Sequence, residues 1–112
     1  MLALTLLLTA ACLVPAAGKL LAHPRMQAAA THFGIPWSRY RLVGLAELAA
    51  AGGLLLGLTV PALGIAAAVG MTALLVVALV FHKQAGDRPR EAMPALTALG
   101  LSLVYLAVAL TH

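Results

Sequence analysis

The segment ALGIAAAVGMTALLVVALVF, residues 62 to 81, runs for 20 residues without a charged side chain. A helix rises about 1.5 Å per residue, so a run of this length crosses a bilayer core of about 30 Å. Residues 1 to 18 and 92 to 111 are equally free of charged side chains, and residues 42 to 60 carry only Glu47. None of these windows alternates polar and apolar residues as a barrel strand would, so the sequence predicts helices.

The composition indicates that lipid is the solvent. Of the 112 residues, 63% are hydrophobic and 9% are charged, and the mean hydropathy is +1.06. A water-soluble fold of this size cannot hide so much apolar surface. We therefore expect one all-α domain, residues 1 to 112, that forms a four-transmembrane-helix bundle in the inner or plasma membrane. The expected helices occupy residues 2 to 22, 40 to 58, 62 to 82 and 93 to 111.

The first window is interpreted as a spanning helix rather than a signal peptide, because no Lys or Arg precedes its apolar run. Cys12 is the only cysteine, so neither a disulfide within the chain nor a CxxC pair is possible. The protein therefore has no thiol couple of its own for redox chemistry.

The basic residues predict the orientation. Residues 19 to 41 hold four Lys and Arg residues and residues 82 to 92 hold the other three, whereas residues 57 to 61 hold none. Short loops rich in Lys and Arg stay cytoplasmic, so we expect both termini on the non-cytoplasmic side. The net charge of +4 is then a topology signal with attraction for anionic headgroups, and nucleic acid is not an expected partner.

The two cytoplasmic connections carry further signals. Residues 26 to 33 are expected to form a short amphipathic segment in the membrane interface. Asp87 and Glu91 are expected at the start of the last helix, where the helix dipole favours acids. Amphipathic rings and long cations settle at headgroup level. The predicted membrane-interface anchors are Trp37, Arg39, Tyr40 and Arg41.

Glu47 is the unusual residue of the second window. It lies six residues beyond Arg41, which places it about 9 Å deep, and a charge near the middle of a membrane costs about 2.5 to 3.5 kcal/mol. The acid must therefore be protonated, paired or beside water. Small residues one turn away, Gly44, Ala50 and Ala51, let another helix approach it closely.

Lys19 and His82 are expected at a similar depth on neighbouring helices, which suggests a polar cluster with Glu47. One interpretation is a buried ion pair that fixes helix register, with His82 at the interface. The other is a cytoplasm-facing cavity in which Glu47 orients the polar group of a lipophilic ligand and His82 carries a proton. Ser102 and Tyr105 either line the deeper end of this cavity or bond to neighbouring backbone.

Several of these stretches resemble the DoxX-like family of small membrane proteins. They are GLAELAAAGGLLLG at residues 44 to 57, the pattern W-x-R-x-R-x-V-G before it, VALVFHKQAGD at residues 77 to 87, and AGKLL at residues 17 to 21. The resemblance covers almost the whole chain and implies a four-helix membrane bundle. It also implies a link to thiosulfate:quinone oxidoreductase subunits, to membrane complexes that detoxify oxidants, or to chaperones of receptor assembly.

Two functional hypotheses follow. The first is an accessory or assembly subunit of a membrane complex that packs on a copy of itself or on a partner membrane protein, with a link to quinone redox chemistry as one form of this hypothesis. The second is a binder or carrier of a lipophilic small molecule, such as a quinone, around Glu47.

Other classes fit the sequence less well. His23, His32 and His82 are not at i, i+4 spacing, so no metal site and no autonomous enzyme is expected. A proton-coupled exporter working as an antiparallel dimer conflicts with the strong charge asymmetry.

Overall fold

The apolar windows form long helices in the computed structural model, which describes residues 1–111. These residues form five helices and no strand, so the protein is all-α. The helices are α1 (Leu2–Leu20), α2 (Pro24–Phe33), α3 (Trp37–Leu56), α4 (Pro61–Gln84) and α5 (Met93–Thr111). The additional helix, α2, contains the amphipathic segment expected at residues 26 to 33. The helix expected at residues 40 to 58 begins earlier, because Pro36 in an extended conformation precedes its first turn at Trp37.

Three helices end in the same hydrogen-bonded turn, the Schellman motif. In this motif the residue after the C-cap is left-handed and the N–H beyond it bonds back to a carbonyl five residues earlier. After α4 the left-handed residue is Gly86, with φ of 77°, and the N–H of Asp87 donates to the His82 carbonyl at 2.9 Å. After α2 it is Gly34, and after α1 it is Ala22, a non-glycine residue with φ of 55°.

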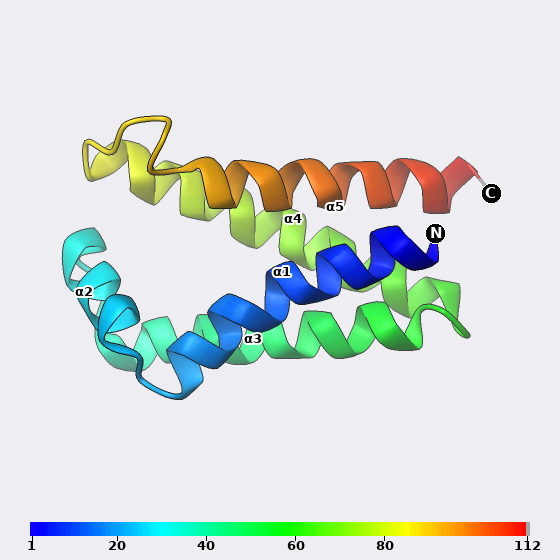
Figure 1. Cartoon of the computed structure of the whole chain (residues 1–112), viewed down its shortest axis with the longest axis horizontal. Coiled ribbons are helices and arrows are strands. Elements are labelled where there is room, and N and C mark those ends of the chain that lie inside the picture. The colour runs from blue at the N-terminus through cyan, green and yellow to red at the C-terminus, as the bar shows by residue number, and fades with distance from the viewer. Residues whose placement is uncertain (112) are drawn as a thin grey trace.

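The five helices form an elongated bundle with extents of 41 × 27 × 18 Å (Figure 1). Helix α3 packs against both α1 and α4, and α5 packs mainly against α4. The N-terminus, the end of α5 and the α3–α4 turn lie at one end, while α2 and the α4–α5 connection lie at the other. The pair α1 and α3 spreads away from α4 and α5 toward the end that carries α2 (Figure 1).

Helices α3 and α4 approach each other closely at glycine positions, where a larger residue would not fit. A Cβ on Gly53 would lie 2.9 Å from the Cβ of Ala67, and a Cβ on Gly57 would lie 2.6 Å from the Cα of Gly64. These contacts bring α3 and α4 together near their connecting turn, which is how small residues promote helix packing in membranes.

The outer surface is apolar, unlike that of a water-soluble bundle, and a few polar groups are buried beside an apolar core. Leu and Val side chains are exposed along the outer surface of all four long helices. The buried polar residues are Thr5, Thr9, Lys19, Glu47 and Ser102. Apolar exterior and polar interior groups are what a lipid environment favours.

Within residues 1–111, three helices are long and apolar enough to cross a membrane, namely α1, α4 and α5. Helix α3 is of similar length, 20 residues, but it contains the charged residues Arg39, Arg41 and Glu47. Together with the apolar outer surface, these helices indicate an integral membrane protein.

Candidate functional site

Lys19 and Glu47 form a buried ion pair between α1 and α3. Nζ of Lys19 lies 2.6 Å from Oε1 of Glu47, and the two side chains are only 8% and 9% exposed. Lys19 belongs to the last turn of α1, and Gly44 lies one turn before Glu47 on α3. A Cβ on Gly44 would lie 2.8 Å from the Cβ of Lys19, so the glycine gives the lysine stem room to reach the acid. The pairing matches the expectation from small residues around Glu47.

The residues expected to anchor the chain in the membrane interface occupy two environments. Arg39 is exposed and Trp37 is partly exposed at the start of α3. Tyr40 instead points inward, because it lies on the α1-facing side of α3, and it is 9% exposed. Its ring centroid is 5.0 Å from Nζ of Lys19, a cation–π distance. Arg41 donates to the Leu20 carbonyl at 3.0 Å and so holds the end of α1 against α3.

A large space, called here the central cavity, opens beside the ion pair. Its volume is about 1020 Å³, and residues from all five helices line it. Most of its wall is hydrocarbon from α1, α4 and α5, including Val14, Leu75, Ala78 and Ala98. Its polar lining residues are Lys19, Arg25, Tyr40, Glu47, His82 and Thr97. Ligand pockets in proteins commonly have volumes of about 300 to 1000 Å³ and a similar balance of apolar wall and few polar groups.

The carboxylate of Glu47 retains an unused oxygen. Oε1 accepts from Lys19, but Oε2 has no hydrogen-bond partner among residues 1–111. In that part of the chain, the enclosed side-chain atoms without a partner are hydroxyls on α1 and α5. Because Glu47 lines the central cavity, its unused oxygen is available to accept a hydrogen bond from a molecule bound there.

His82 is bonded to Asp87, five residues further along the chain. The Schellman turn at Gly86 brings the Asp87 side chain back over the last turn of α4, where Oδ2 lies 2.6 Å from Nδ1 of His82. The expectation that Asp87 and Glu91 occupy the first turn of the last helix is wrong, because α5 begins at Met93 and has no acid in its first turn.

The same carboxylate also binds α2. Oδ1 of Asp87 lies 2.6 Å from Nε2 of His32, so His32, Asp87 and His82 form an imidazole–carboxylate cluster. The Asp87 side chain is 7% exposed. The hydrogen bond with His32, and then that with His82, holds the pKa of Asp87 below its ordinary value against the opposing effect of desolvation. The rings of Phe33 and His82 form a T-shaped pair with their centroids 4.9 Å apart. Phe33 also lines the cavity.

Ser102 and Tyr105 lie elsewhere. Both are buried on α5, but neither lines the central cavity. Tyr105 belongs to the apolar core, and its hydroxyl occupies the space where a Cβ on Gly64 would stand. The Ser102 hydroxyl is enclosed without a hydrogen-bond partner within residues 1–111. The deeper end of the site is therefore formed by apolar side chains.

Sequence reasoning missed Asp87 and His32 as partners of His82, and Arg25 and Phe33 as lining residues. Gly86, directly before Asp87, was the available signal for a helix-ending turn that folds Asp87 back. The positions of the other three residues depend on the packing of α2 against the ends of α3 and α4, and no local pattern indicates that packing.

The DoxX-like family model matches residues 3–111 of the chain. Lys19, Glu47, His82 and Asp87 all lie within the matched region. No curated protein and no solved structure matches the chain.

Proposed function

The chain belongs to the DoxX-like family, and from that premise we propose that it is a four-span membrane protein that binds a lipophilic small molecule in its central cavity. Three spans are α1, α4 and α5, and α3 is the fourth. Its 20 residues correspond to about 30 Å, its charged Glu47 is paired, and its exposed side chains include Leu45 and Leu48.

The charge pattern supports an orientation for this proposal. The Lys and Arg residues belong to the end of the bundle that carries α2 and the α4–α5 connection, and the start of α1 and the end of α5 lie at the opposite end (Figure 1). Short basic loops remain in the cytoplasm. The cavity's polar wall then faces the cytoplasmic half of an inner or plasma membrane.

The single observation that carries the proposal is the accessible ion pair in the cavity wall. A pair that served only to fix helix register would have its hydrogen-bonding groups satisfied within the protein, whereas Oε2 of Glu47 has no partner in residues 1–111 and faces a volume of about 1020 Å³. A quinone-like molecule or another lipophile with one polar end matches this wall. The protein would hold or carry this molecule without transforming it.

Native mass spectrometry of the protein purified in mild detergent tests the proposal. We expect a small-molecule adduct with the wild type, the same adduct with Glu91→Gln, and no adduct with Glu47→Gln. Glu91 is the matched control because it is exposed and does not line the cavity. A second variant, Ala78→Phe, fills the cavity while leaving the ion pair in place and should also lose the adduct. A wild type without an adduct, or an adduct that survives both cavity variants, contradicts the proposal.

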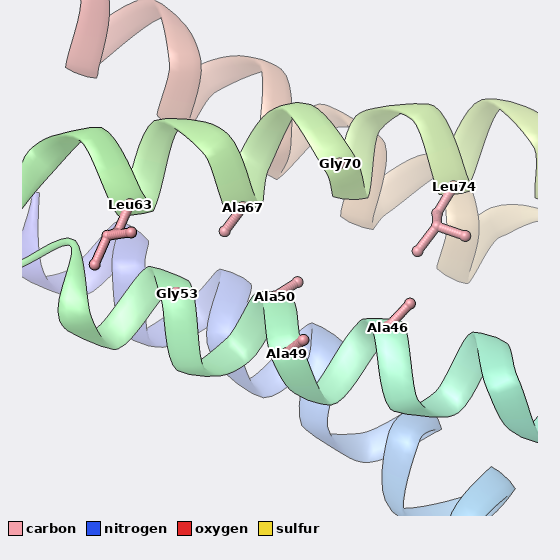
Figure 2. Close-up of a pocket in the computed structure, with 8 residues that line it drawn as sticks. All are labelled: Ala46, Ala49, Ala50, Gly53, Leu63, Ala67, Gly70 and Leu74. Atoms are coloured by element: carbon pink, nitrogen blue, oxygen red, sulfur yellow. The ribbon is translucent and has the colours of Figure 1, made fainter.

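A second candidate function is assembly with another membrane helix, and a groove between α3 and α4 favours it. Figure 2 shows Ala46 and Ala50 of α3 pointing toward Leu63, Ala67 and Leu74 of α4. The groove has a volume of about 410 Å³. Its lining residues are Ala46, Ala49, Ala50, Gly53, Leu63, Ala67, Gly70 and Leu74. Small residues on an outer face let a transmembrane helix of a second copy or of a partner subunit approach closely.

Gly70 offers a clean test of assembly, because nothing lies within 4 Å of a Cβ placed on it. Gly70→Leu should block the groove without disturbing the bundle, and Gly100→Leu, equally open, is the matched control. Mass photometry in nanodiscs should show a smaller particle for Gly70→Leu alone if a second copy occupies the groove. If a partner subunit occupies it, affinity purification should lose a co-purifying membrane protein. An unchanged mass and unchanged co-purification would remove this candidate.

A further inference from the structure

The hydrogen bonds of Asp87 fix which ring nitrogen of His82 carries the proton. An ionised carboxylate only accepts hydrogen bonds, and the His32 and His82 contacts that lower the pKa of Asp87 favour its ionised form. Nδ1 of His82, at 2.6 Å from Oδ2, must therefore donate. A neutral imidazole has a single N–H, so Nε2 of His82 carries a lone pair.

This Nε2 atom is a free acceptor in the wall of the central cavity. It has no hydrogen-bond partner within residues 1–111, and His82 lines the cavity. Two contacts hold the ring. One is the hydrogen bond to Asp87, and the other is the T-shaped contact with the Phe33 ring, whose centroid is 4.9 Å from that of His82. Since Asp87 is also bonded to His32 of α2, the orientation of His82 depends on two neighbouring elements.

The Glu47 carboxylate, in the same cavity wall, offers a second hydrogen-bond acceptor. Oε2 of Glu47 has no hydrogen-bond partner within residues 1–111. The ammonium group of Lys19 donates to Oε1 at 2.6 Å and lies 5.0 Å from the centroid of the Tyr40 ring, which leaves it further N–H donors. Arg25, the remaining cation, is exposed. The wall therefore holds two acceptors without a donor, on α3 and α4, beside donors from Lys19, Arg25 and Thr97. A ligand hydroxyl can serve both kinds of group, whereas a carbonyl group leaves both acceptors unpaired.

We propose that the central cavity selects lipophilic alcohols and phenols, whose hydroxyl donates to Nε2 of His82, and that Asp87 is the positioning residue that sets this preference. The proposal deepens the binding function proposed above and rests on it. A quinol would fit this site better than the corresponding quinone, because only the quinol has O–H donors.

Three probes of matched shape test the preference at pH 8: para-decylphenol, its methyl ether, and decyl phenyl ketone. The protein is held in nanodiscs of zwitterionic lipid and binding is measured by titration. We expect the wild type to bind the phenol about tenfold more tightly than the ether or the ketone, which corresponds to one hydrogen bond. Asp87→Asn should bring the three affinities within about threefold, because an amide can donate as well as accept and no longer enforces one tautomer. Arg90→Gln, at an exposed position in the same connection, should keep the preference.

A second readout does not depend on any ligand. The ¹⁵N chemical shifts of His82 in the wild type should show a protonated Nδ1 and an unprotonated Nε2, and Asp87→Asn should shift both signals toward a mixture of tautomers. A protonated Nε2 in the wild type at pH 8 overturns the inference. Equal affinities for the three probes overturn the preference but leave the binding function standing, whereas failure of all three to bind overturns both.

Discussion

Removal of the Lys19 ammonium group, as in Lys19→Met, should strongly destabilise the protein, because it leaves the Glu47 carboxylate buried without its cation. The two charged atoms are 2.6 Å apart, so the lost attraction is about 6 kcal/mol at an effective dielectric constant of about 20. The carboxylate can take up a proton instead, so the loss of stability cannot exceed the free energy of protonating it. For a carboxylic acid with an aqueous pKa of about 4.3, protonation costs about 3.7 kcal/mol at pH 7. We therefore expect the free energy of unfolding to fall by about 3 to 4 kcal/mol.

Titration with sodium dodecyl sulfate in maltoside micelles, followed by circular dichroism, measures this loss. At pH 5 the loss should shrink to about 1 kcal/mol, since protonation from water then costs less. Lys83→Met is the matched control, because Lys83 is exposed on α4 and should change stability by about 0.5 kcal/mol or less. The double variant Lys19→Met with Glu47→Leu should regain most of the loss. A loss below about 1 kcal/mol at pH 7, or an equal loss at both pH values, would refute the reasoning.

Three further predictions use the same titration. Ala22→Gly should raise the free energy of unfolding by about 1 kcal/mol, since residue 22 has φ of 55° and glycine adopts this region without strain; no gain would contradict the strain. Gly64→Ala should cost about 1 to 3 kcal/mol, because the new methyl group meets a tyrosine hydroxyl of α5, whereas Gly100→Ala has open space and should not destabilise. The hydrogen bond with His32 holds the pKa of Asp87 below its ordinary 3.8, so its stabilisation is complete above that pH and is lost as the pH falls through the lowered pKa. The wild type should therefore lose more stability than Asp87→Asn on acidification, and parallel pH profiles would exclude this contribution.

The long helices could be predicted because a run without charges is a property of the segment itself. Their ends depend on single left-handed residues, which are less evident. Helix α4 continues to Gln84, two residues past the expected 82, because its terminating glycine is Gly86. Helix α1 stops at Leu20 because Ala22 takes the left-handed conformation, which alanine disfavours, so the composition of that turn indicates no end there.

Some contacts of the candidate site could likewise be predicted from the sequence, and others could not. Lys19 and Glu47 are opposite charges in apolar windows with small neighbours, and burial leaves such groups few alternatives to pairing. The bond between His82 and Asp87 requires a turn that brings two residues five positions apart into contact. The contact of His32 with that carboxylate requires the docking of α2, and tertiary packing of this kind cannot be derived from local spacing.

The position of a bound lipophile tests the central claim most directly. Isotope-filtered nuclear Overhauser spectra of para-decylphenol with the protein in deuterated nanodiscs report which methyl groups the probe touches. The cavity account predicts contacts with Ala78 and Ala98, which line the central cavity, and their loss in Ala78→Phe. Contacts confined to Val76 and Leu103, which are exposed on the outer surface, would show that the probe dissolves in the surrounding lipid and would contradict the account.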